Sequence, residues 1–171
     1  LPIASRPVRC IEVDSPSRLF LCGRQYIPTH NSSFINEICG RMAQRYGWRT
    51  IFASFEQVPQ KDHRRALRSF YGEKLEVAMM PEELAAADAW IERHFGFIYP
   101  DDDDEVDLKY VLETGAQAIL RREAHIMVID PWNEMDHIRA PDQSLTEYVG
   151  TAIKTLKKFA RKYRIHLIVA A

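Results

Sequence analysis

Helical and extended patterns alternate along the chain from residue 32 onward, and this alternation constrains the fold more than any other feature. Helices are predicted at 32–46, 59–71, 81–95, 106–122 and 146–163, and strands at 50–55, 97–99, 125–130 and 165–170. The predicted helices carry apolar residues at three- and four-residue spacing, whereas the strands are short apolar runs. Such alternation is typical of a parallel sheet with helices on both faces. We therefore expect an α/β fold for residues 32–171.

The first 31 residues have a different character. Short β-prone runs at residues 8–13, 19–21 and 26–27 take the place of helical patterns. A segment of this length cannot bury a core of its own. We therefore predict a domain boundary at the Asn31–Ser32 bond, with residues 1–31 and 32–171 as separate units.

Composition narrows the class of protein. The chain has 171 residues, of which 46% are hydrophobic, and a net charge of −1 that indicates no polyanion partner. No apolar run approaches the ~20 residues of a membrane span, so we expect no membrane partner. An odd number of cysteines without metal-type spacing favours a reducing compartment, here the cytoplasm of a prokaryotic or phage-infected cell. Leu1 in place of an initiating Met indicates a fragment.

The tripeptide His30-Asn31-Ser32 carries the groups that a self-cleaving peptide bond requires. Asn31 can cyclise to a succinimide and so break its bond to Ser32. His30 can polarise the Asn31 carbonyl or protonate the leaving amine. The Ser32 hydroxyl can hold an acyl group as an ester. The alternative is a capping turn, because Asn or Ser before an apolar helical run is a common N-cap.

Together with the run from Val8 to Gly23, this tripeptide makes residues 7–32 resemble the C-terminal splicing block of inteins. The resemblance implies the all-β HINT fold and protein splicing without a cofactor. Cys10 and Thr29 resemble the markers of class 3 inteins, in which the internal Cys is the first nucleophile, a role that suits a thiol. The alternative for Cys10 is a core residue of a strand. Arg18 stands where many inteins have His, and Arg cannot act as a general base.

The remainder of the chain carries three further motifs. Ser32-Ser33-Phe34-Ile35 looks like the end of a Walker A loop, Phe52–Gln57 like a strand that ends in a catalytic Glu, and Ile126–Glu134 like a Walker B strand and its sequel. On these motifs, residues 32–171 resemble the RecA-like P-loop motor domain of DnaB-like and Twinkle-like replicative helicases. The resemblance implies ATP and Mg²⁺ as cofactors, single-stranded DNA as a partner and a homo-hexameric ring.

The resemblance also implies a role for each matching residue. Ser32 would ligate Mg²⁺ and Ser33 would lie beside the nucleotide. Asp130 would hold the same Mg²⁺ through water from the carboxyl end of a strand. Glu56 would activate the attacking water, and Asn133 would lie near the nucleotide. Two alternatives stay open: Asp130 as part of a plain strand-ending turn, and Glu56 as a solvated loop acid.

The two resemblances meet at Ser32. The chain supplies the Ser of Gly-x-x-x-x-Gly-Lys-Ser without the Gly-rich loop or the Lys, so an intein would interrupt the Walker A loop between Lys and Ser. The predicted function is a splicing precursor that meets a complementary N-terminal intein–helicase fragment and yields an ATP-dependent DNA helicase. The alternatives are a P-loop ATPase fragment without active splicing and a non-catalytic oligomerisation fragment.

Overall fold

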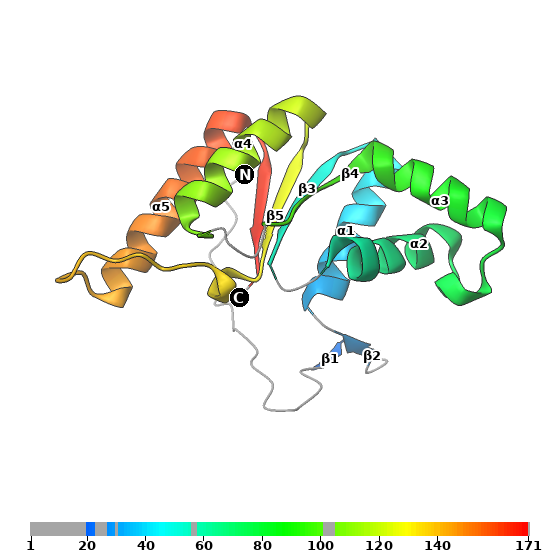
Figure 1. Ribbon diagram of the computed structural model, residues 1–171, viewed down its shortest axis with the longest axis horizontal. Helices are drawn as coiled ribbons and strands as arrows, with labels where there is room; N and C mark the ends of the chain where they lie inside the picture. The colour runs from blue at the N-terminus through cyan, green and yellow to red at the C-terminus, as the bar shows by residue number, and fades with distance from the viewer. Residues whose placement is uncertain (1–19, 23–26, 30, 56–57, 101–104, 171) are drawn as a thin grey trace, which may run out of the picture.

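A four-stranded parallel sheet forms the centre of the computed structural model, which describes residues 20–22, 27–29, 31–55, 58–100 and 105–170 (Figure 1). Its strands are β3 (Thr50–Ser54), β4 (Phe95–Ile98), β5 (Ile126–Asp130) and β6 (His166–Val169). They lie in the order β4-β3-β5-β6, and every neighbouring pair is parallel. The parallel α/β sheet expected from the alternating pattern is confirmed.

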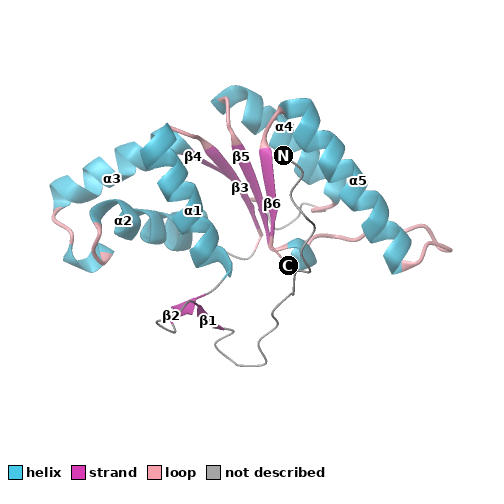
Figure 2. Ribbon diagram, turned by 180° about the vertical axis from the view of Figure 1, so that it is seen from behind, coloured by secondary structure: helices cyan, strands magenta, loops and turns pink. Residues whose placement is uncertain are grey.

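Helices cover both faces of this sheet (Figures 1 and 2). One face is covered by α1 (Asn31–Tyr46), α2 (Arg64–Gly72) and α3 (Pro81–His94), and the other by α4 (Leu108–Arg122) and α5 (Leu145–Tyr163). A π-helical turn, Pro59–His63, leads into α2, and 3-10 turns span Glu76–Ala78 and Trp132–Glu134. None of the described helices is long and apolar enough to cross a membrane.

The central strands are buried on both faces, and alternate side chains enter different cores. Ile51 and Met127 belong to the cluster under α4 and α5, whereas Phe52 and Val128 belong to the cluster under α1, α2 and α3. This two-residue alternation follows from the pleat of a strand. Glycine allows one of the helices to lie very close to the sheet, since a Cβ at Gly115 of α4 would come 2.6 Å from Cε of Met127.

Two details differ from the sequence prediction. Strand β4 begins at Phe95 rather than at residue 97, directly after α3, because no Gly or Pro separates the two elements. In α5 the buried face is shifted: Tyr148 and Ala152 are buried, whereas Val149 is half-buried and Ile153 is 45% exposed. The predicted stripe of Val149, Ile153, Leu156, Phe159 and Tyr163 is therefore correct only in its second half.

A small hairpin precedes α1. Strands β1 (Phe20–Cys22) and β2 (Ile27–Thr29) pair antiparallel, with Phe20 opposite Thr29. This two-stranded sheet is separate from the four-stranded one. The strand predicted at 8–13 lies outside the described residues.

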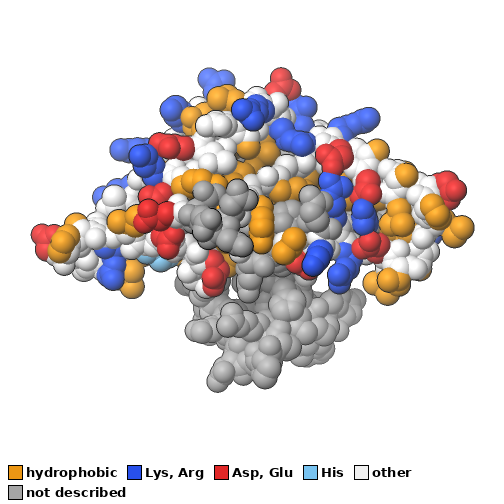
Figure 3. Space-filling model, viewed as in Figure 1, with side chains coloured by type: hydrophobic (Ala, Val, Ile, Leu, Met, Phe, Trp, Pro, Cys, Tyr) orange, Lys and Arg blue, Asp and Glu red, His pale blue; other side chains and the backbone are white. Residues whose placement is uncertain are grey.

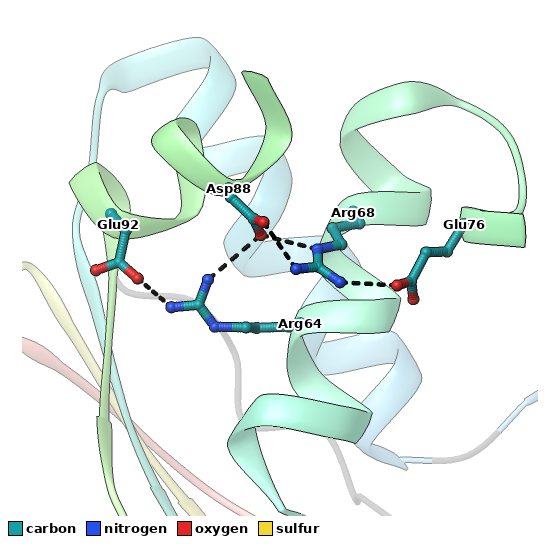
Figure 4. Close-up of polar contacts among 5 residues, drawn as sticks. All are labelled: Arg64, Arg68, Glu76, Asp88 and Glu92. Carbon is teal, nitrogen blue, oxygen red and sulfur yellow. Dashed lines mark hydrogen bonds and ion pairs between the residues drawn. The ribbon is translucent and has the colours of Figure 1, made fainter. Parts of the chain in front are cut away.

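Ion pairs join α2 to α3 on the outside of the sheet (Figure 4). The guanidinium of Arg68 donates two hydrogen bonds to the carboxylate of Asp88, at 2.8 and 2.7 Å, and a third to Glu76 at 2.7 Å. Arg64, one turn earlier, pairs with Asp88 and Glu92. These contacts fix the angle between the two helices.

Candidate functional site

The carboxyl ends of β3 and β5 lie side by side at one edge of the sheet. Ser54 is the last residue of β3 and is in register with Asp130, the last residue of β5. The backbone N–H of Phe55 then donates to the carbonyl oxygen of Asp130 at 3.3 Å. In open α/β sheets ligands bind beyond this edge, so these strand ends are the first place to look for a site.

Asp130 is the buried acidic group of this edge. Only 6% of the residue is exposed, and its Oδ2 atom has no hydrogen-bond partner among the described residues. Burial raises the pKa of Asp130, and a side-chain hydrogen bond with Ser32 acts in the opposite direction. A buried carboxylate oxygen without a partner is costly, which indicates that this oxygen serves a ligand.

The amino end of α1 brings Ser32 to the same place. Ser32 is half-buried and Ser33 is exposed, and the first turn of this 16-residue helix holds no acidic residue. Free backbone N–H groups and the helix dipole make such an end favourable for anions. An anion-binding helix end thus lies next to a carboxylate that can take a cation.

This donor set fits Mg²⁺ bound to a phosphate group. The described residues contain no group of three or more His, Cys, Asp or Glu side chains able to hold a metal. Mg²⁺ does not need one, because it is usually held by one or two protein oxygens, waters and substrate phosphates. The Ser32 hydroxyl and the Asp130 carboxylate supply hard oxygen ligands of this kind.

A buried polar group that the sequence analysis missed lies just behind this edge. The side chain of His63 is fully buried, with Nε2 3.0 Å from Oγ of Ser54 and Nδ1 3.4 Å from Oδ1 of Asn36. Burial lowers the pKa of His63 to about 4, so the ring is neutral at pH 7. In the sequence, His63 is one polar position inside a predicted helix, and no motif marks it.

The other predicted residues fall into two groups. Asn133 is exposed in the turn that follows Asp130, close in sequence to the candidate edge. Thr29 belongs to β2 and Asn31 begins α1, with their side chains outside the description. Cys10, His30 and Glu56 lie outside the described residues.

Cys39 behaves as predicted for a core residue. It is fully buried, and burial raises the pKa of its thiol to about 11. Because the thiolate is the reactive form, this cysteine has no chemical role at neutral pH.

Comparison with known sequences relates the chain to replicative helicases. It is 30% identical over 146 residues to the Twinkle homolog protein, chloroplastic/mitochondrial, of Arabidopsis thaliana, a match that covers 80% of this chain and 20% of the relative. It is 55% identical over 31 residues to the replicative DNA helicase DnaB of Mycobacterium leprae (strain TN), covering 18% of this chain and 5% of that protein. No protein-family model matches. The chain is thus homologous to DnaB/Twinkle-like helicases and spans about a fifth of the Twinkle homolog.

Comparison with solved structures agrees on the fold. The ATPase domain of G40P superimposes with a TM-score of 0.64 at 17% identity, over 81% of this chain and 51% of that one. A DnaB-like replicative helicase, solved in a study of its interactions with primase, gives a TM-score of 0.60 at 18% identity, over 81% and 36%. The fold is that of a RecA-like helicase ATPase domain.

Proposed function

We propose that residues 32–171 are the nucleotide-binding part of a DnaB/Twinkle-like replicative DNA helicase that hydrolyses ATP with Mg²⁺. One observation carries the proposal: the buried Asp130 carboxylate, with a partnerless Oδ2, hydrogen-bonds to Ser32 at the amino end of α1. This combination places a cation-binding oxygen beside an anion-binding helix end.

Each residue has a defined task in this proposal. Ser32 and Asp130 hold Mg²⁺, which when bound offsets the negative charge of the phosphates. The amino end of α1, including Ser33, binds the phosphate oxygens. Glu56, two residues after the end of β3 in the sequence, orients the attacking water, and Asn133 lies beside the nucleotide.

The test uses the completed helicase, with the missing Walker A residues joined to Ser32. Asp130→Asn should lower kcat for ATP hydrolysis by about a hundredfold, because Mg²⁺ binding is worth several kcal/mol to charge development. Asp142→Asn, in an exposed turn, is the matched control and should leave kcat unchanged. Equal rates for wild type and Asp130→Asn would refute the proposed metal site.

We further propose that residues 1–31 are the C-terminal fragment of an intein that excises itself at Asn31 and joins its partner fragment to Ser32. The support is the sequence block with Cys10, Thr29 and His30. The separate β1–β2 hairpin, which joins no strand of the four-stranded sheet, agrees with a distinct unit before α1. In this proposal Cys10 attacks the upstream junction, Ser32 receives the acyl group and His30 assists cyclisation of Asn31.

Mass analysis tests splicing directly. Mixed with the complementary N-terminal fragment, the chain should give a ligated product that begins its C-terminal part at Ser32 and has lost residues 1–31. Asn31→Ala should block release of the intein. Cys10→Ala should abolish the branched intermediate, whereas Cys22→Ala, the control thiol, should splice normally. Normal splicing by Asn31→Ala would exclude this mechanism.

The alternative is a helicase ATPase fragment without active splicing, and it is favoured by the fact that the related proteins are named as helicases. Titration with a fluorescent ATP analogue separates the two proposals. The unspliced chain lacks the Walker A Lys and most of the loop N–H groups, so it should bind ATP·Mg²⁺ poorly, and ligation should restore binding. Micromolar binding before ligation would favour the alternative. The ligated, completed protein should also form hexamers and bind single-stranded DNA.

A further inference from the structure

His63 connects three elements that meet behind the candidate site. It is the last residue of the π-helical turn Pro59–His63, and its ring nitrogens reach Asn36 of α1 and Ser54 of β3. The ring also packs against Phe52 and Phe97, with centroid distances of 4.7 and 5.5 Å. A side chain held on all sides in this way has one position.

The hydrogen-bond partners determine where the ring proton lies. With Oδ1 of Asn36 as its neighbour, Nδ1 must donate, because a carbonyl oxygen only accepts. A neutral ring then has a lone pair on Nε2, which accepts the hydroxyl proton of Ser54. His63 is thus donor to α1 and acceptor from β3 at the same time. A neutral imidazole is suited to this double task, because one ring nitrogen donates while the other accepts.

Both partners lie one step from the groups that would hold Mg²⁺. Asn36 is four residues after Ser32, and positions four apart share one face of a helix. Ser54 is in register with Asp130 across β3 and β5. The hydrogen bond between His63 and Ser54 also closes the nine-residue span that contains Glu56 in the sequence.

The local backbone is unusual at this point as well. The turn that ends in His63 is π-helical, whereas α2 continues from it as an α-helix. Single π turns are rare and are frequently found at functional sites, because the extra residue redirects a side chain. Here the redirected side chain is the one that enters the space between α1 and β3.

We propose that His63 is a positioning residue for ATP hydrolysis, which fixes the start of α1, with Ser32, relative to the end of β3 and Asp130. This inference rests on the proposed ATPase function. His63 touches neither Ser32 nor Asp130 in any printed contact, so it acts through Asn36 and Ser54. Nucleotide affinity depends mainly on the phosphate loop, whereas turnover depends on alignment of the reacting groups. Loss of His63 should therefore lower kcat more than it raises KM.

The main variant is His63→Phe in the completed helicase, because Phe keeps a ring between Phe52 and Phe97 but removes both hydrogen bonds. We expect kcat to fall by about tenfold or more, with KM for ATP changed by less than about threefold. His63→Gln, which can still donate and accept, should recover part of kcat. The matched control is His94→Phe, at the carboxyl end of α3 and thus at the opposite edge of the sheet, where His94 lies 2.9 Å from the carbonyl oxygen of Trp90. It should keep the wild-type kcat.

A purely structural role gives a different result. In that case His63→Phe lowers the melting temperature while the folded fraction keeps its kcat, and this outcome would overturn the proposal. If His63→Phe does not fold, Ser54→Ala and Asn36→Ala decide the matter: each should lower kcat, and normal kcat in both would be decisive against a positioning role. Failure of the ATPase proposal is recognised separately, because the wild-type protein would then show no hydrolysis that depends on Asp130.

Discussion

The two faces of the sheet are built from different materials. Under α4 and α5 the buried residues are apolar: Ile51, Ala53, Ile98, Val111, Ile119, Ala124, Met127, Ile129, Met135, Leu156, Phe159 and Ile165. Under α1, α2 and α3 the apolar cluster is accompanied by buried polar residues, among them Asn36 and His63. The same sheet thus has one face that contributes mainly stability and one that also organises the candidate site.

The exposed surface repeats part of this contrast. Figure 3 shows hydrophobic side chains interspersed with charged ones over the visible face. The described ion pairs that link α2 and α3 are on the polar side of the sheet. A polar layer needs every group matched with a partner, since an unpaired buried group costs about 1–3 kcal/mol. An apolar layer requires only volume and shape.

The largest effect should come from the apolar face. Phe159→Ala removes a ring that is 8% exposed in the cluster under α4 and α5, and should destabilise the chain by about 3–5 kcal/mol. Ile153→Ala on the same helix, 45% exposed, should change stability by less than about 1 kcal/mol. Urea denaturation measures both. Similar losses for the two variants would contradict the burial that separates the faces.

A second prediction concerns pH and sharpens the contrast. Burial lowers the pKa of His63 to about 4, and nearby Asp62 opposes this only in part. Because the unfolded chain protonates His63 near the ordinary pKa of about 6.5, stability should be complete above that pH and fall as the pH drops toward 4. The loss should be roughly 2–3 kcal/mol.

His63→Phe is the variant that isolates this effect. It should remove the slope of stability between pH 6.5 and 4, whereas Phe159→Ala should lower stability equally at both ends of the range. Denaturation midpoints measured at several pH values test this. A slope that survives in His63→Phe would assign the pH dependence to other groups.

The smallest effect is expected for the ion pairs of α2 and α3. Arg68 and Asp88 are partly exposed, at 22% and 34%, so solvent screens their attraction, and a double-mutant cycle should give about 0.5–1 kcal/mol. The hydrogen bonds from Arg68 hold the pKa of Asp88 below its usual value. The coupling should therefore persist at neutral pH and disappear once the pH falls below the ordinary Asp pKa of about 3.9. A coupling energy unchanged by acid would exclude this assignment.

The sequence predicted the sheet well because its strands are short apolar runs bounded by turns. Asp130 at the end of β5 was also identified, since a carboxylate directly after a buried run has a clear position in a parallel sheet. The buried face of α5 was predicted only in part. Helical spacing alone did not separate the set with Val149 and Ile153 from the set with Tyr148 and Ala152, and packing against the sheet selected the second.

His63 shows what a single sequence does not contain. Its partners, Asn36 and Ser54, are 27 and 9 residues away, and only the fold brings the three together. The π-helical turn that aims its ring is set by tertiary contacts and has no residue signature. A motif search finds residues adjacent in sequence, and this network has none.

The alternation of side chains along β3 also limits how this part of the chain can change in evolution. Phe52 faces the helices α1 to α3, and Ser54, two positions later, is held on that side by His63. A substitution alters one contact, but insertion or deletion of one residue would turn every following side chain to the opposite face. Length changes in homologues should therefore be absent from residues 50–54 and gather instead in the loops, where an added residue alters no register.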